Sequence, residues 1–566
     1  MNEEVLTEEA VDAAGGLDLL LTDAALGIWH RLRPDSSVLR LAGELARRPG
    51  FTVRQAGSLA AELGRIAAGR SSVAAHPKDR RFADPAWTEN PLLRRCVQAY
   101  LAAAASAETL VAGAELGWRD DTRLKFLLTN YIAAAAPSNN PLLSPVGWKA
   151  VIDTGGENAV RGLRNLASDL ATSPRVPSMV PAGAFEVGRD LASTAGGVVH
   201  TTDQFELIQY QPVTETVHRY PLLIVPPMIN KYYIVDLAPG RSMVEFLVGQ
   251  GHQVFVMSWR NPDARHRGWN LDTYGGALVE ALTAVLAITG APKASLCALC
   301  SGGIMATMVA AHLAVTGQLD QLASLCLGVA VLDQSQSGTA GAFIDEKTAA
   351  AAMAVSASRG YLDGRALAEV FAWLRPDDLI WNYWVNNYLA GRAPPAFDIL
   401  YWNADVTRLP AALHHDFIRL GLANALVTPG AATMLGSPVD LGKVDLDAYV
   451  VAGISDHLCP WESCYRTTQL LGGPVRFVLS TSGHIAAMVN PPTNAKAAFR
   501  TVAGGTSPAD PREFLATATT VPGSWWTDYA AWLAERGGGE RKSPRTLGRK
   551  VYPVRSTAPG TYVHDR

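Results

Sequence analysis

One cysteine in this sequence stands where a predicted strand runs into a Gly-rich turn and an apolar helix. The segment Ala298-Leu299-Cys300-Ser301-Gly302-Gly303 follows the Gly-x-Ser-x-Gly pattern of a nucleophile elbow, with Cys300 replacing the serine and Ala298 the first glycine. Small residues flank such a nucleophile because the turn is tight and strained. The N-terminus of the following helix would point at the sulfur, and its positive dipole end favours a thiolate. Cys300 is therefore the predicted nucleophile; the alternative is a buried core cysteine at a Gly-rich turn.

The candidate acid and base follow the nucleophile in the order nucleophile, acid, base. Asp456 comes just after a predicted strand that ends near Gly453, and His484 comes just after the next predicted strand. Both therefore stand at the carboxyl ends of strands, where loops build active sites. We expect Cys300, Asp456 and His484 to form a catalytic triad. Two alternatives remain open: His457 as the base, and Asp333, after an earlier strand, as the acid.

Such a triad needs backbone N–H donors for the oxyanion that forms during acyl transfer. The N–H of Ser301 would be one donor, and the second should come from the loop after the first core strand, Pro226-Pro227-Met228-Ile229-Asn230. A proline has no N–H to donate, so Met228 or Ile229 must supply it. One such donor is typically worth about 2.7–4 kcal/mol of transition-state stabilisation.

The composition argues against several classes of partner. The net charge is −3 and no long basic stripe is present, so nucleic acid is not an expected partner. The acidic N-terminus lacks the pattern of a signal peptide, so we expect a cytoplasmic protein whose six cysteines are not paired as disulfides.

Two cysteine pairs have spacings that a zinc or redox site could use. They are Cys297 with Cys300, and Cys459 with Cys464. The first pair lies on a strand, whose period of two points Cys297 away from the face used by its neighbours. We therefore expect neither a metal nor a cofactor.

From about residue 198 onwards, short β-rich segments alternate with amphipathic helices. Strands are predicted at 205–210, 221–225, 253–258, 294–299, 322–332, 448–452 and 476–479, and helices at 273–288 and 303–315. This alternation predicts a doubly wound, mostly parallel sheet, and together with the elbow it predicts an α/β-hydrolase fold. The stretch 294–319 contains no Asp, Glu, Lys or Arg, but its strand-like first half favours a buried strand–turn–helix over a transmembrane segment.

The domain organisation follows from changes in the pattern of predicted helices and strands along the chain. Residues 1–190 are expected to form a mainly helical N-terminal domain, and residues 191–566 the catalytic domain. Within the latter, about residues 334–440 interrupt the alternation and would form a cap over the carboxyl ends of the strands. Its aromatic residues, from Trp381 to Tyr388 and at Trp402, suggest a wall that limits water at the site. The alternative is that they pack the cap or a dimer contact.

Long segments of the chain resemble the polyhydroxyalkanoate synthases over nearly its whole length. They are DRRFADPAWTENPLLRR (79–95), VPPMINKYYIVDL (225–237), SWRNPD (258–263), CSGG (300–303), WNYWVNNYL (381–389), FDILYWNADVTRLP (397–410), DHLCPW (456–461), SGHIAAMVNPP (482–492) and PGTYVHDR (559–566). The chain is most similar to the long single-subunit types, particularly those that use medium-chain monomers. The family's Cys, Asp and His fall on Cys300, Asp456 and His484. Ala298 is a departure, because the family usually has Gly there.

The resemblance implies an acyltransferase that polymerises (R)-3-hydroxyacyl-CoA into polyester, with release of CoA through an acyl-cysteine and without a metal or cofactor. It implies that the enzyme binds the growing polyester chain, associates with polymer granules in the cytoplasm and forms a homodimer. Asp456 would either orient His484 or activate the incoming hydroxyl. Two other functions remain open: a cysteine-dependent hydrolase or acyl-CoA thioesterase on the same fold, and a non-catalytic granule-associated scaffold protein.

Overall fold

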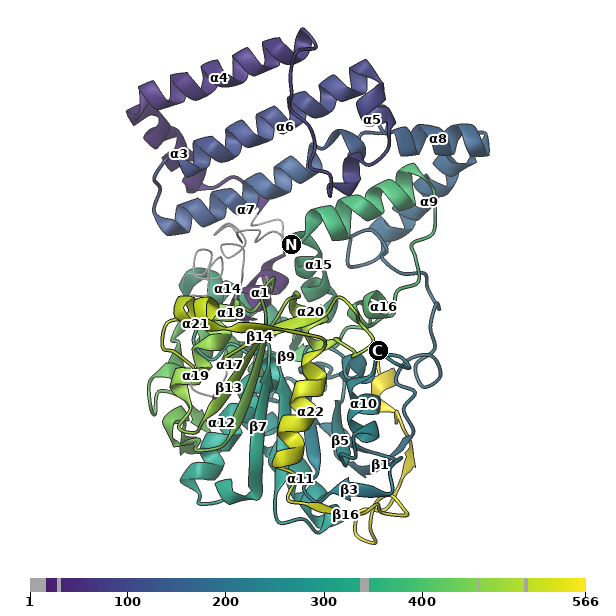
Figure 1. The fold of residues 1–566 in the computed structure, drawn as a ribbon, viewed down its shortest axis with the longest axis vertical. Helices are drawn as coiled ribbons and strands as arrows, with labels where there is room; N and C mark the ends of the chain where they lie inside the picture. The colour runs from purple at the N-terminus through teal and green to yellow at the C-terminus, as the bar shows by residue number, and fades with distance from the viewer. Residues whose placement is uncertain (1–16, 28–31, 336–345, 457, 503–506) are drawn as a thin grey trace. The chain divides into compact units, whose positions relative to one another are not determined.

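The computed structural model describes residues 17–27, 32–335, 346–456, 458–502 and 507–566 (Figure 1). The chain divides into two compact units. The sheet unit comprises Gly183–Gly364 and Asp398–Arg566 together with the described residues up to Ala25. The helical unit comprises Leu26–Ala182 and Arg365–Phe397.

The described part of the sheet unit is built on an eleven-stranded sheet, in the order β15-β14-β13-β12-β7-β6-β4-β5-β2-β1-β17. The strands are β1 (Gly196–Thr201), β2 (Phe205–Tyr210), β4 (Leu222–Val225), β5 (Val254–Trp259), β6 (Ala294–Leu299), β7 (Leu322–Gly328), β12 (Ala448–Gly453), β13 (Val475–Ser480), β14 (Ala498–Thr501), β15 (Thr519–Pro522) and β17 (Ser556–Thr557). The central run from β13 to β5 is parallel throughout, whereas the strands added at both ends are antiparallel. The sheet is therefore mostly parallel, as predicted.

Most predicted strands coincide with observed ones, and the differences have physical reasons. β2 and β6 match their predicted ranges from end to end. β7 ends at Gly328 instead of residue 332, because Val329 has φ 46°, which takes the chain out of the extended conformation. The antiparallel strands β1, β14, β15 and β17 were not predicted. β14, β15 and β17 are only two to four residues long and lie at or next to the ends of the sheet.

Helices cover the buried sheet. α11 (Leu271–Thr289) and α12 (Ser301–Val315) contact each other and also β4 and β6. α10 (Met243–Gly249) and α22 (Trp525–Glu535) meet through Phe246 and Trp526, whose ring centroids are 5.9 Å apart. Among the described residues, α11 is the one helix long and apolar enough to cross a membrane, and 56% of its apolar window is buried inside the fold. Its contacts identify it as a core helix beside the sheet.

The remaining helices of the sheet unit lie mainly in the loops after β7, β12 and β13. They are α1 (Leu17–Leu26), α14 (Glu346–Arg359), α16 (Asp398–Ala404), α17 (Ala411–Leu422), α18 (Trp461–Tyr465), α19 (Thr467–Leu470), α20 (His484–Met488) and α21 (Pro511–Thr517). α1 is bound within this unit, because His414 Nε2 lies 3.1 Å from the Leu21 carbonyl oxygen. The first helix of the described residues therefore belongs with the sheet and not with the other N-terminal helices.

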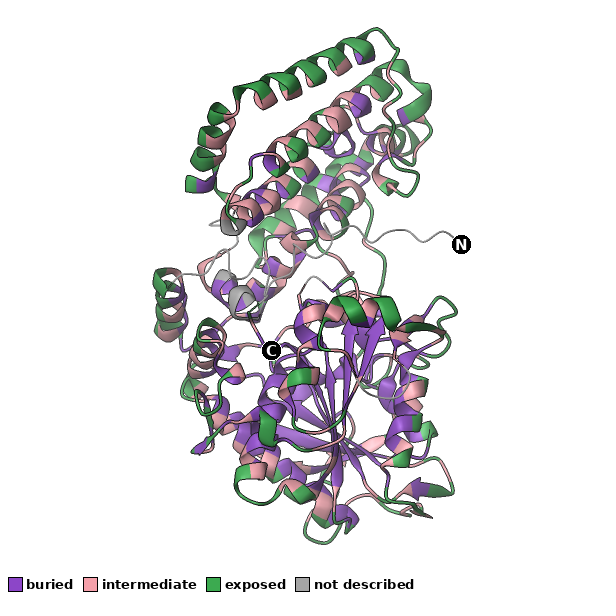
Figure 2. Cartoon of the chain, turned by 60° about the vertical axis from the view of Figure 1, so that its left-hand side comes forward, coloured by how far each residue is buried: buried purple, intermediate pink, exposed green. Residues whose placement is uncertain are grey.

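The helical unit combines N-terminal helices with an insertion from the predicted cap. Its helices are α3 (Ser36–Arg47), α4 (Pro49–Ala67), α5 (Ala86–Glu89), α6 (Pro91–Ala112), α7 (Trp118–Ala134), α8 (Pro145–Thr154), α9 (Glu157–Ala171) and α15 (Gly364–Leu374), followed by π-helical turns at Asp377–Trp381 and Trp384–Leu389. Figure 2 shows that these helices carry much more exposed surface than the sheet.

Aromatic residues of the insertion bind to the N-terminal helices. Trp384 Nε1 donates to the Asn139 carbonyl oxygen (3.1 Å), and the Tyr388 hydroxyl donates to Asp169 Oδ2 (2.7 Å). Gly162 of α9 allows close approach, because a Cβ there would lie 1.9 Å from the Tyr388 carbonyl oxygen. The segment 381–388 therefore has a packing role within the helical unit.

Candidate active site

Cys300 stands at the turn between β6 and α12 and is the N-cap residue of that helix. Its φ of 49° and ψ of −121° are rarely adopted by a residue with a side chain, and such strain is typical of functional sites. Its N–H donates to the Gly328 carbonyl oxygen on the neighbouring strand (2.8 Å). The next two residues after Ser301 must be glycines, because a side chain at either position would clash. A Cβ on Gly302 would lie 2.6 Å from the Pro226 carbonyl oxygen, and one on Gly303 would lie 2.7 Å from Ala330 Cβ. The geometry is that of a nucleophile elbow.

The parallel pairing of β12 and β13 brings Asp456 and His484 together. Gly453 and Ser480, at the ends of these strands, are register partners, so the loops that follow leave the sheet side by side. The Ser455 N–H donates to the Ser482 carbonyl oxygen (3.1 Å) and joins the two loops. His484 Nδ1 then lies 2.8 Å from Asp456 Oδ2, and the Asp456 side chain is fully buried.

The second oxygen of Asp456 is fixed by backbone donors. Oδ1 accepts hydrogen bonds from the N–H groups of Leu458 (2.8 Å) and Cys459 (2.9 Å). The carboxylate therefore has one oxygen for the imidazole and one for its own loop. This arrangement fixes both its orientation and the conformation of the loop.

The electrostatics of Cys300 favour a thiolate. A hydrogen bond with the Cys459 side chain is the largest influence on the Cys300 pKa and lowers it. Burial opposes this, but His484 and the Ser301 N–H add to the lowering, and the Cys300 pKa falls to about 5. Its position at the N-terminus of α12 acts in the same direction.

The electrostatics of His484 favour the imidazolium. Burial alone would lower its pKa, but the charge of Asp456 and hydrogen bonds with Asp456 and Cys300 outweigh burial and raise the His484 pKa to about 10. At neutral pH the proton therefore resides on His484 and the negative charge on Cys300. The residue predicted to be the nucleophile therefore carries the charge that attack on a thioester requires.

The loop predicted to complete the oxyanion hole is held by several parts of the sheet unit. Trp259 Nε1 donates to the Pro226 carbonyl oxygen (3.1 Å), and Trp402 Nε1 donates to that of Lys231 (2.7 Å). Thr407 Oγ1 donates to the Met228 carbonyl oxygen (3.2 Å). Trp402 is therefore a buried support for this loop.

The predicted oxyanion donors differ in their surroundings. The Ser301 N–H is directed at the Cys300 sulfur. The Met228 N–H donates to Ser301 Oγ (3.1 Å), so the Ser301 hydroxyl already occupies it. Of the two residues predicted to supply the second donor, this arrangement favours Ile229 over Met228.

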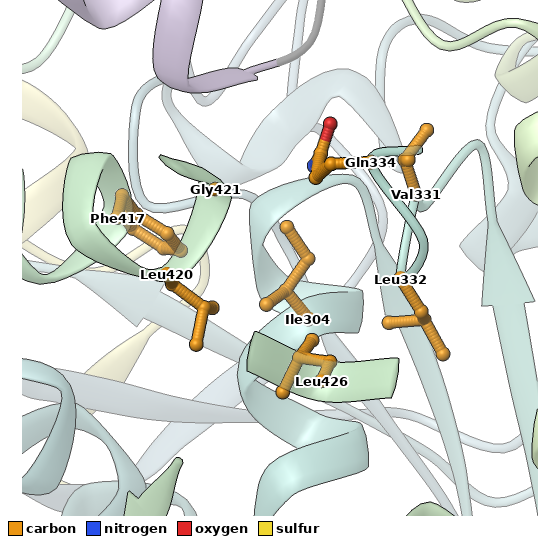
Figure 3. Close-up of a pocket in the computed structure, with 8 residues that line it drawn as sticks. All are labelled: Ile304, Val331, Leu332, Gln334, Phe417, Leu420, Gly421 and Leu426. Atoms are coloured by element: carbon orange, nitrogen blue, oxygen red, sulfur yellow. The ribbon is translucent and has the colours of Figure 1, made fainter. Parts of the chain in front are cut away.

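A small cavity lies beside the first turn of α12 (Figure 3). Ile304 stands between Phe417 and Leu420 of α17 on one side and the segment after β7 on the other. The volume of this cavity is about 10 Å³, roughly what one water molecule needs. It cannot hold an acyl chain in this conformation.

Comparisons with known proteins identify the family. Residues 78–247 match the family described as "Poly-beta-hydroxybutyrate polymerase (PhaC) N-terminus", and residues 221–491 match the alpha/beta hydrolase fold. Poly(3-hydroxyalkanoate) polymerase 1 of Ectopseudomonas oleovorans is 45% identical over 100% of this chain and 99% of its own length. Polymerase 2 of the same organism is 45% identical over 94% of each chain. The polymerase subunit PhaC of Cupriavidus necator is 39% identical over 88% of this chain and 85% of its own.

The chain belongs to the poly(3-hydroxyalkanoate) polymerases. The resemblance drawn from the sequence and the α/β-hydrolase fold predicted from the elbow are both confirmed.

The alternative acid of this polymerase is engaged elsewhere. Asp333 forms an ion pair with Arg466 and accepts a hydrogen bond from Asn424 Nδ2 (2.9 Å). Burial raises the Asp333 pKa, but the hydrogen bonds from Asn424, Ser335 and Arg466 prevail and the pKa is lowered. The alternative base, His457, lies outside the described residues.

The structure brings the cysteines of the polymerase together in combinations other than the two pairs that their spacing in the sequence suggested. Cys297 is the register partner of Cys326 on β7, and both sulfurs interact with Tyr529 of α22. The residue that sequence reasoning missed is Cys459, which it considered only as a partner of Cys464. The available signal was its position three residues after Asp456, within a loop predicted to border the site.

Proposed function

We propose that Cys300, His484 and Asp456 of this poly(3-hydroxyalkanoate) polymerase transfer (R)-3-hydroxyacyl groups from CoA to a growing polyester through an acyl-cysteine. The observation that carries the proposal is the pairing of a buried cysteine at the elbow with an imidazole whose other nitrogen is bound by Asp456. A thiolate is a strong nucleophile toward thioesters, and the imidazolium beside it is a ready proton donor.

In the first half-reaction, the Cys300 thiolate attacks the thioester carbonyl carbon. The resulting oxyanion is stabilised by backbone N–H groups, with Ser301 and Ile229 as the proposed donors. The intermediate collapses when its bond to the CoA sulfur breaks. The leaving thiolate takes the proton from Nε2 of His484, which leaves an acyl-cysteine and a neutral imidazole.

In the second half-reaction, the neutral imidazole acts as the base. His484 Nε2 takes the proton from an incoming hydroxyl, whose oxygen attacks the carbonyl carbon of the acyl-cysteine. A new ester bond forms, and Cys300 leaves as a thiolate beside the regenerated imidazolium. One histidine thus serves both halves of the cycle.

Asp456 has the orienting role in this proposal. Its Oδ2 bonds Nδ1 of His484, while its Oδ1 is occupied by two backbone N–H groups. Both oxygens are therefore engaged, and the Asp456 side chain is fully buried, which supports an orienting role over direct proton transfer from an incoming hydroxyl. The carboxylate stabilises the imidazolium and turns Nε2 toward the sulfur.

The cellular location, the oligomeric state and the preferred monomer length are also proposals. The family resemblance supports a cytoplasmic enzyme associated with polymer granules, a homodimer, and a preference for medium-chain monomers. Nothing in the mechanism above requires a metal or a cofactor.

The decisive experiment measures CoA release and polymer composition across (R)-3-hydroxyacyl-CoA substrates from four carbons upward. We expect stoichiometric CoA release with polymer as the main product, and faster turnover for medium-chain substrates. CoA release with free hydroxy acid as the main product would instead support a thioesterase. Faster turnover of the four-carbon substrate would refute the medium-chain preference alone.

A further inference from the structure

Cys459 places a third soft donor atom beside the catalytic pair. A ligand atom of Cys459, one of Cys300 and one of His484 all lie within 4.8 Å of one another. Both cysteines are buried and His484 is partly buried. The reaction steps proposed above use only the sulfur of Cys300 and the imidazole of His484. The Cys459 side chain is hydrogen-bonded to Cys300, and its sulfur also places a third metal-ligating atom beside the pair.

We propose that Cys300, Cys459 and His484 form a binding site for zinc or a similarly soft divalent metal ion, and that the bound ion inhibits the polymerase. Thiolate and imidazole are the ligands that zinc prefers, and three protein ligands with one open position are a common arrangement. Tetrahedral coordination with ordinary zinc–ligand bonds places the donor atoms about 3.4–3.8 Å apart. The trio therefore needs to contract by at most about 1.4 Å, a distance that side-chain rotations can cover.

The surroundings of the trio support the site independently. Metal-binding histidines usually donate their other ring N–H to a carboxylate, which fixes the free nitrogen toward the ion. Asp456 Oδ2 is 2.8 Å from His484 Nδ1, so it is Nε2 that faces the sulfurs. Asp456 Oδ1 accepts the N–H of Cys459 (2.9 Å), so the same carboxylate also holds the backbone of the third ligand. One residue therefore orients two of the three ligands.

Inhibition follows from the atoms that the ion would occupy. Bound zinc engages the lone pairs of the Cys300 sulfur and of His484 Nε2, so the thiolate cannot attack and the imidazole cannot carry a proton. The protons of the Cys459 thiol and of Nε2 leave to solvent on binding. This consequence rests on the catalytic roles proposed above, whereas the binding site itself does not.

The first test compares zinc inhibition in three forms of the enzyme. CoA release is measured over a range of zinc concentrations for the native protein, for Cys459→Ala and for Cys464→Ser, and each rate is divided by the zinc-free rate of the same variant. Cys464 is a matched control, because it is also buried and its sulfur lies 4.0 Å from the Cys459 carbonyl oxygen, but it is outside the trio. Loss of groups that only support a metal ligand already weakens binding about 10–100-fold.

We therefore expect Cys459→Ala to raise the half-inhibiting zinc concentration by about 100-fold or more. Cys464→Ser should behave like the native protein, and a chelator should reverse the inhibition. Equal zinc sensitivity in the native protein and Cys459→Ala overturns the proposal.

The second test does not depend on activity. Cobalt(II) is titrated into the native protein, Cys459→Ala and Cys300→Ala, and the thiolate-to-cobalt charge-transfer absorbance is measured. We expect a band in the native protein that is weaker by about half or more in each variant. A native-like spectrum in Cys459→Ala overturns the site. A cobalt spectrum of the expected form in an enzyme that zinc does not inhibit would instead refute the catalytic role of Cys300.

Discussion

Replacement of Asp456 by asparagine should disable both half-reactions together. In the native protein, Oδ1 accepts two backbone N–H groups and Oδ2 faces His484 Nδ1. An asparagine at this position must keep its oxygen on the two N–H donors, because its NH₂ group cannot accept from them. The NH₂ group then points at Nδ1 and donates to it. The imidazole is forced to carry its proton on Nε2, in the tautomer that cannot act as the base.

The size of the effect follows from the same contacts. Burial lowers the His484 pKa, and the charge and hydrogen bond of Asp456, together with Cys300, raise it, so the pKa falls when the carboxylate is removed and the ion pair with Cys300 is lost. The same substitution in a Ser-His-Asp triad lowers kcat about 10⁴-fold. This corresponds to about 5.5 kcal/mol in activation free energy at about 1.36 kcal/mol per tenfold change. We expect a loss of that order in acylation and in elongation alike.

The assay is a rapid-quench measurement of the CoA burst, compared with the steady-state rate, in Asp456→Asn. Asp333→Asn is the control, because Asp333 pairs with Arg466 and not with His484. The control should keep most of both rates, provided that it melts near the native temperature. A near-normal burst in Asp456→Asn followed by a stalled steady state would refute the reasoning, because it would mean that Asp456 acts on the incoming hydroxyl.

Four further predictions test other parts of the site. Cys300→Ala should abolish CoA release while Cys297→Ala keeps most of it; comparable losses in two folded variants would contradict this. Activity should fall below about pH 5, where the Cys300 thiolate is protonated, and above about pH 10, where His484 loses its proton; a single-limbed pH profile of the rate would argue against an ion pair. Trp402→Phe leaves the buried Lys231 carbonyl oxygen without its donor, so the free energy of unfolding should fall by about 1–3 kcal/mol and CoA release should slow without a change in the ratio of free acid to polymer. An increased share of free acid would support the water-excluding wall instead. Treatment with a metal chelator should not reduce CoA release, and a loss that zinc restores would show that a metal is required.

Sequence reasoning worked best where the signal was local. The range of β6 could be predicted because a short apolar strand, small residues and an apolar helix follow one another directly in the chain; the helix itself was predicted at 303–315 and runs over Ser301–Val315. The strand after that helix was predicted too long, because the apolar run continues past Gly328 although the backbone turns at Val329. The cap was treated as one insertion, yet Arg365–Phe397 groups with the N-terminal helices, through contacts between segments far apart in the chain.

The family, the fold class and the position of Cys300 at the elbow could be read from the sequence, since each depends on residue types at fixed spacing. Which side-chain atoms meet depends on the folded chain. The tertiary structure joined His484 to Asp456, engaged Asp333 with Arg466, and placed the sulfur of Cys459 beside that of Cys300. These contacts depend on the order of strands in the sheet and on the loops at their ends. They are set by the packing of the whole unit, which no short stretch of sequence encodes.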